Sequence, residues 1–155
     1  MDINLTQKER LLLEDQKSHE EICIEKYSNY ANLANDVQLK QICKANETSE
    51  KSHLNSINQL LNGQIPQTNQ QQQNNQNAQN NWSNAPATGL NINDQDICTD
   101  LLMTEKYVSG TYDTAIFEFQ NTNVRDVLNH IQKEEQKHGE AIFQFMQNKG
   151  MYNPK

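Results

Sequence analysis

A Glu-x-x-His motif occurs twice in this chain, at residues 50–53 and 135–138, and it constrains the fold more than any other feature. The two motifs lie 85 residues apart, and shifting the chain by that offset brings further identical residues into register. These are Asp15 with Asp100, Glu20 with Glu105, Tyr27 with Tyr112, Ile57 with Ile142, and Gln59 with Gln144. Self-similarity at a fixed offset indicates a repeated structural unit. The two halves are therefore predicted to be divergent copies.

The first half is predicted to form a helical hairpin over residues 6–62. Thr6 and Glu9 make a capping box for a first helix of about residues 6–34. Asn35 and Asp36 then form a turn, and Asp36 can cap a second helix that runs to about residue 61. Gly63 follows, and glycine is the usual residue just after the end of a helix.

The second half repeats this pattern and is predicted to form another hairpin over residues 94–149. Asp94 can cap a helix to about residue 120, residues 121–123 (Asn-Thr-Asn) read as the turn, and a last helix ends before Gly150. The chain is therefore expected to be all-α, with two αα-hairpins in a single domain over residues 1–155.

Residues 64–93 separate the two hairpins, and more than half of them are Gln or Asn. Such a composition buries too little apolar surface to offset the entropy of ordering, so a disordered linker is predicted here. The linker is long enough to cross the whole length of a helical bundle. It could promote self-association, as Gln/Asn-rich segments do, or be a tolerated insertion in a surface loop.

Helical spacing places both Glu-x-x-His motifs in mainly apolar stripes. The second helix has Leu, Cys, Asn, Glu, His, Ile and Leu at positions 39, 43, 46, 50, 53, 57 and 60, the spacing of a bundle seam. The fourth helix repeats this stripe 85 residues later, with Glu135 and His138 in the middle. Glu20 and Glu105 occupy similar apolar stripes in the first and third helices. Four carboxylates and two imidazoles are therefore predicted to point inward.

Four ionised carboxylates in a core would repel each other and lose their hydration, so a positive partner is required. One Glu from each of two helices and a Glu-x-x-His from each of the other two is the dimetal ligand set of ferritin-like four-helix bundles. The predicted ligands are Glu20, Glu50, His53, Glu105, Glu135 and His138. Glu50 and Glu135 would bridge two metal ions. The oxygen-rich set favours iron or manganese over zinc. The alternative is a relic site without metal, with its carboxylates partly protonated or hydrated.

Tyr27 and Tyr112 lie two turns from Glu20 and Glu105 on the same helix faces. Their hydroxyls could hydrogen-bond to ligand carboxylates, or they could be core aromatic residues whose polar tips find another partner. His19 and His130 fall outside the matched positions and are expected on helix surfaces. Cys23 and Cys43 are read as small buried apolar side chains, since the three cysteines form no Cys-x-x-Cys pair.

Charge and hydropathy exclude several classes of partner. The formal net charge is -7, and no basic patch is present, which argues against nucleic acid and anionic membrane surfaces as partners. No run of about 18 apolar residues suggests membrane insertion, and the first residues lack the pattern of a signal peptide. Synthesis in the cytoplasm is therefore expected.

Three stretches resemble the spore coat protein F family of endospore-forming Firmicutes, especially its clostridial members. They are LLLEDQKSHEEICIEKY at residues 11–27, TEKYVSGTYDTAIFEFQNTNVRDVLNHIQKEEQKHGE at 104–140, and GMYNPK at 150–155. The resemblance implies a ferritin-like fold and a place in the protein coat that the mother cell lays around the forespore. Other coat proteins would then be the partners. The residue pattern itself carries none of this biology.

Three functions are compatible with these features. The first is a spore coat component on a ferritin-like scaffold that binds two iron or manganese ions. The second is a dimetal enzyme, oxidase-like or manganese-catalase-like, that acts on dioxygen or peroxide with an external electron donor. The third, metal storage, is disfavoured because no cage-forming surface is identifiable. A homodimer is a further expectation, since bundles of two repeats often pair through outer helix faces.

Overall fold

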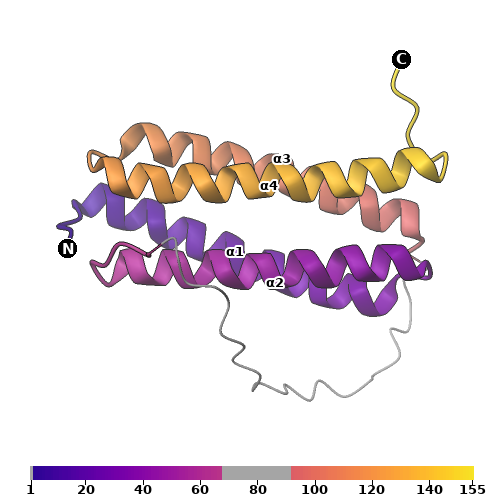
Figure 1. The fold of residues 1–155 in the computed structure, drawn as a ribbon, viewed down its shortest axis with the longest axis horizontal. Helices are drawn as coiled ribbons and strands as arrows, with labels where there is room; N and C mark the ends of the chain where they lie inside the picture. The colour runs from indigo at the N-terminus through magenta and orange to yellow at the C-terminus, as the bar shows by residue number, and fades with distance from the viewer. Residues whose placement is uncertain (1, 68–91) are drawn as a thin grey trace.

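The computed structural model describes residues 2–67 and 92–155, and these form four long α-helices (Figure 1). Their bounds are α1 Gln7–Leu33, α2 Val37–Leu61, α3 Asp94–Glu118 and α4 Thr122–Asn148. The helices pack as two hairpin pairs, α1 with α2 and α3 with α4. The prediction of an all-α four-helix bundle made of two hairpins is confirmed. The predicted linker lies mostly outside the described residues.

The helix ends follow the local signals in the first half of the chain. The backbone N–H of Glu9 donates to the Thr6 hydroxyl, and the Thr6 N–H donates to the Glu9 carboxylate, which completes the capping box. Asp36 caps α2 by accepting from the Gln38 N–H. Gly63 has a φ of 80°, a left-handed conformation that favours glycine, and its carbonyl accepts from the Ile3 N–H. The N-terminal segment is thereby attached to the end of α2.

Two boundaries in the second half differ from the prediction. Asn93, rather than Asp94, caps α3, because the Asn93 side chain accepts from the Asp96 N–H. The Asp94 carboxylate instead accepts from the N–H groups of Asn35 and Asp36, at 2.8 and 2.9 Å, in the turn between α1 and α2. The expected turn at residues 121–123 is also shorter, since Asn121 already caps α4, which begins at Thr122.

Each helix has two main neighbours. The first helix α1 packs against α2 and α3, and α4 packs against α3 and α2. Cross-contacts show that α1 and α3 are antiparallel: Glu9 near the start of α1 contacts Gln120, and Lys26 near its end contacts Asp100. The end of α2 and the start of α3 therefore lie at opposite ends of the bundle, which fits the predicted crossover connection.

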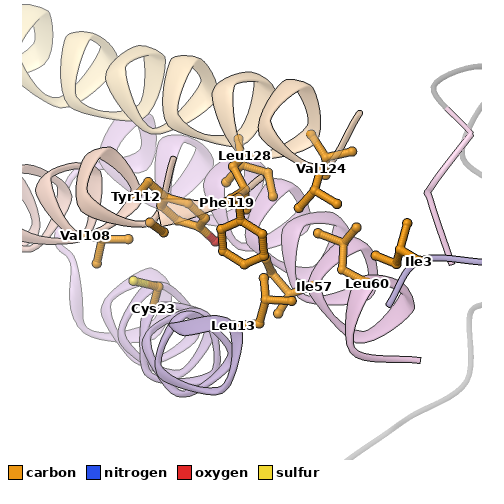
Figure 2. Packing of buried hydrophobic residues seen from close by; sticks show 13 residues of the cluster. Ile3, Leu13, Cys23, Ile57, Leu60, Val108, Tyr112, Phe119, Val124 and Leu128 are labelled. Atoms are coloured by element: carbon orange, nitrogen blue, oxygen red, sulfur yellow. The ribbon is translucent and has the colours of Figure 1, made fainter. Parts of the chain in front are cut away.

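The apolar core has two parts, one toward each end of the bundle. Figure 2 shows the first part, where Leu13, Ile57, Tyr112 and Leu128 from the four helices point toward one another. The second part contains residues such as Leu39, Leu101 and Phe145. Along α2, α3 and α4, the predicted metal ligands lie between these apolar parts, whereas Glu20 on α1 lies between Leu13 and Cys23 of the first part. Cys23 and Cys43 are free and buried, as predicted.

Candidate metal centre

The six predicted ligands are buried in the middle of the bundle. None exposes more than 5% of its surface. Each helix contributes through the inward stripe on which the sequence places it: Glu20 from α1, Glu50 and His53 from α2, Glu105 from α3, and Glu135 and His138 from α4. Because charged side chains are rarely buried without partners, this cluster requires a chemical explanation.

The ligand atoms form two overlapping groups that could each hold a metal ion. One group contains Glu20, Glu50, His53 and Glu135, and the other contains Glu50, Glu105, Glu135 and His138. Within each group, one ligand atom from every residue lies within 4.8 Å of the others. Glu50 and Glu135 belong to both groups, so they occupy the positions expected of bridging carboxylates.

Both imidazoles turn the same nitrogen toward the carboxylates. His53 Nδ1 lies 3.1 Å from Glu50 Oε2 and 3.3 Å from Glu135 Oε1. His138 Nδ1 lies 3.2 Å from Glu50 Oε1 and 3.3 Å from Glu135 Oε2. The two rings are stacked, with centroids 5.7 Å apart. Each imidazole thus faces one oxygen of each shared carboxylate, as terminal ligands of two neighbouring ions would.

Several of these buried atoms have no hydrogen-bond partner among the described residues. They are Glu20 Oε2, Glu50 Oε1, Glu105 Oε2, both carboxylate oxygens of Glu135, and His138 Nδ1. His138 Nδ1 is near carboxylate oxygens but is not aligned for a hydrogen bond to them. An unsatisfied buried polar atom costs about 1–3 kcal/mol, and more when it is charged. The arrangement therefore fits divalent ions, which would use these lone pairs.

Without a metal ion, protons would balance the charge of this cluster. Burial raises the pKa of Glu105 to about 9 and that of Glu20 well above its usual range. Burial acts the same way on Glu50 and Glu135, but the two imidazoles close to their oxygens outweigh it and hold both pKa values below the usual range.

The two histidines add positive charge to the cluster, because their imidazoles are held in the protonated form. Burial by itself would lower the pKa of an imidazole, but the carboxylates close to each ring favour its protonated form and outweigh burial. They raise the pKa of His138 to about 11 and also raise that of His53. At neutral pH, the ionised carboxylates of Glu50 and Glu135 would then face two imidazolium groups, Glu105 would be protonated, and the raised pKa of Glu20 favours its protonated form.

Two buried tyrosines hold the outer carboxylates. The Tyr112 hydroxyl donates to Glu20 Oε1 at 2.5 Å, and the Tyr27 hydroxyl donates to Glu105 Oε1. The sequence suggested hydrogen bonds between these tyrosines and ligand carboxylates as one of two alternatives. In the structure, each tyrosine contacts the carboxylate of the neighbouring hairpin rather than the one on its own helix. These contacts fix the orientation of Glu20 and Glu105.

Glu134 also belongs to the site, although helical spacing does not predict it there. Its Oε2 lies 2.8 Å from His53 Nε2, and this contact lowers the pKa of Glu134 to about 2. A carboxylate on the outer nitrogen of a metal-binding histidine orients the ring. The 85-residue offset relates Glu134 to Ser49, whose hydroxyl donates to Glu134 Oε2 at 3.2 Å. The two halves of the site therefore differ outside the ligands.

The remaining histidines lie outside the cluster. His130 is exposed, and its Nε2 is 3.5 Å from Glu134 Oε1. His19 is half-buried against the Tyr107 ring, so the expectation of a surface position is met only in part. Among the described residues, no helix is long and apolar enough to cross a membrane.

Two comparisons with known proteins bear on the family of this chain. Residues 93–155 match the family model described as the Coat F domain. The uncharacterized protein YusN of Bacillus subtilis (strain 168) is 33% identical over 66 residues. That alignment covers 43% of this chain and 60% of YusN. No solved structure matches. The match confirms the resemblance to the coat protein F family over residues 93–155, whereas the resemblance of residues 11–27 and the ferritin-like relationship stay predictions.

Proposed function

We propose that this protein is a component of the spore coat, because residues 93–155 match the Coat F domain model, and that its bundle core binds two metal ions. The first part rests on the family of the second hairpin, and location in the coat and contact with other coat proteins follow from it. The second part rests on the buried cluster of both hairpins.

One observation carries the metal proposal: two ligand groups share Glu50 and Glu135, and the shared and outer carboxylates leave buried lone pairs without hydrogen bonds. Glu50 and Glu135 would bridge the ions. Glu20 with His53, and Glu105 with His138, would complete the two coordination shells. With three carboxylates and one imidazole for each ion, the donors are hard, which favours iron or manganese.

The surrounding residues give this site its chemical character. Tyr112 and Tyr27 would keep Glu20 and Glu105 oriented toward the ions, and the apolar core on both sides would exclude water. When bound, a carboxylate-bridged pair of iron or manganese ions supplies redox chemistry toward dioxygen or peroxide. Enzymatic activity stays the alternative prediction, to be tested only in protein with both positions filled.

The metal proposal is tested by measuring metal content. Protein purified without an affinity tag is analysed by mass spectrometry beside Glu50→Gln/Glu135→Gln. This variant keeps the shape of both side chains but removes the bridging charges. Wild-type protein is expected to contain about two iron or manganese ions per chain, and the variant close to none.

A matched control makes the same chemical change on the same two helices. Glu47 and Glu140 lie outside the cluster, so Glu47→Gln/Glu140→Gln should keep the wild-type metal content. Circular dichroism shows whether each variant is folded. Folded wild-type protein that holds no metal and takes up none when iron or manganese is added would contradict the proposal and favour the relic site.

The coat proposal is tested by location. A fluorescent fusion of the full chain, made in the mother cell of a sporulating bacterium, should form a ring around the forespore and remain with the coat fraction of purified spores. The fluorescent protein alone should stay diffuse. A fusion that also stays diffuse, although it is stable and full-length, would argue against a role in the coat.

A further inference from the structure

The outer side of α3 carries an exposed apolar stripe. Met103, Tyr107 and Phe117 expose 60%, 64% and 84% of their surface. Together with Gly110 and Thr114 they recur at alternating spacings of four and three residues, which places all five on one side of the helix. We call these five residues the outer stripe. Since α3 packs on α1 and α4 through its buried residues, the outer stripe faces away from the core, although the Tyr107 ring also contacts His19 of α1.

The internal repeat shows that the fold does not require this stripe. The equivalent positions of α1, 85 residues earlier, are Ser18, Ile22, Glu25, Asn29 and Asn32. Four of these five are polar, although α1 occupies the same place in its hairpin and buries its opposite side in the same way. The apolar character of the outer stripe is therefore particular to α3, which indicates contact with something outside this bundle.

Gly110 lies at the centre of the outer stripe, and no contact among the described residues explains it. A Cβ atom at this position would meet nothing within 4 Å, and the residue has no positive φ. A glycine in a helix interior costs about 1 kcal/mol relative to alanine. The absence of a side chain permits another helix backbone to approach closely at this point.

Two charged residues beside the outer stripe are complementary to each other. Lys106 and Asp113 are exposed, and neither forms an ion pair with another described residue. At 100° per residue they lie on the same edge of the stripe. Lys106 lies four residues before Gly110, and Asp113 lies three residues after it. In an antiparallel crossing centred on Gly110, Lys106 of each helix faces Asp113 of the other, and Met103 faces Phe117.

We propose that the outer stripe of α3 is the contact between two copies of this chain, which cross antiparallel at Gly110. The contact is isologous, because a two-fold axis makes the same residues meet from both sides. Burial of Met103, Tyr107 and Phe117 stabilises the dimer, while the Lys106–Asp113 pairs select the antiparallel orientation. This interface is separate from the metal-binding cluster and does not depend on metal.

Sedimentation velocity of the full chain at micromolar concentration tests the interface. Wild-type protein should sediment as two chains of 17.9 kDa, and Gly110→Glu as one. Glutamate is the residue that α1 carries at the equivalent position, and the open space at Gly110 lets the monomer accept it. Circular dichroism should show unchanged helix content. Lys137→Asp, on the exposed surface of α4, is the control and should leave the dimer intact.

A charge exchange tests the orientation. Lys106→Asp should weaken the dimer about tenfold or more, because two carboxylates then face Asp113 and its symmetry mate. Lys106→Asp/Asp113→Lys should restore wild-type association, since the pairs reform with opposite polarity. A monomeric wild type would overturn the proposal and leave the stripe to another occupant, such as residues 68–91 or a different protein. A dimer unaffected by Gly110→Glu, or a charge exchange without rescue, would also overturn it.

Discussion

The side chain of Glu134 contributes to the candidate site in a way that helical spacing does not predict. It lies one turn before His138 on α4, which is the pattern of a solvated surface pair. In the structure its carboxylate reaches His53 on α2 instead. Tyr27 likewise contacts Glu105 rather than Glu20. Such cross-contacts depend on how neighbouring helices are rotated and shifted, and a periodic pattern in one helix does not determine this.

Replacing Glu134 should weaken one metal position more than the other. Glu134→Gln keeps the size of the side chain but removes the charge that orients His53, so the affinity of the ion held by His53 should fall about 10- to 100-fold. Titration of the protein with manganese or iron(II), followed by calorimetry, should resolve one weakened and one nearly unchanged equivalent. Glu140→Gln is the control. Equal weakening of both equivalents would contradict the role assigned to Glu134.

Metal binding should release protons, because metal ligands bind in their deprotonated forms. The raised pKa values favour the protonated forms of His53, His138, Glu20 and Glu105 at pH 7. Two divalent ions would displace these protons, with at least the histidine proton lost at each ion, so apparent affinity should fall about tenfold or more for each ion per unit decrease in pH near neutrality.

Calorimetry in buffers of different ionisation enthalpy measures this release directly. The number of protons released on metal binding should decrease above about pH 9, because Glu105 is then already ionised in the metal-free protein. Binding with no proton release at pH 7 would show that the histidines are already neutral and the carboxylates already ionised.

At the scale of the helices, the sequence predicts the existence and approximate bounds of each helix better than it predicts which backbone group each capping side chain contacts. The Thr6–Glu9 capping box can be predicted because both partners are local. Asn93 and Asp94 are both good caps, and the sequence does not decide between them. The structure does so through tertiary contact: the Asp94 carboxylate satisfies two backbone N–H groups of the turn between α1 and α2.

Asp94 should therefore stabilise the contact between the two hairpins. Asp94→Ala removes both hydrogen bonds to the turn and should lower the free energy of unfolding by about 1–2 kcal/mol, measured by urea denaturation. Asp96→Ala is the matched control, because Asp96 lies in the same helical turn and its side chain makes no such contact. Equal effects of the two substitutions would mean that Asp94 acts only through the helix dipole.

At the scale of the whole molecule, the repeat made the bundle predictable. Two hairpins with apolar stripes must bury those stripes against each other, and the stripe positions in α2 and α4, including Glu50 and His138, are all buried. The sequence does not predict which helix of the second hairpin packs on α1, because the apolar stripes of α3 and α4 are similar enough to allow either. The structure pairs α1 with α3.

Because the two similar hairpins are joined in one chain, equivalent positions in them can carry different residues. If the bundle were assembled from two identical hairpins, any substitution would appear on both sides of the two-fold axis. Here Ser49 and Glu134 occupy equivalent places, yet only one is acidic. Covalent linkage thus allows the two imidazoles to acquire different basicity, and two ions held there would differ in reduction potential, which strict symmetry forbids.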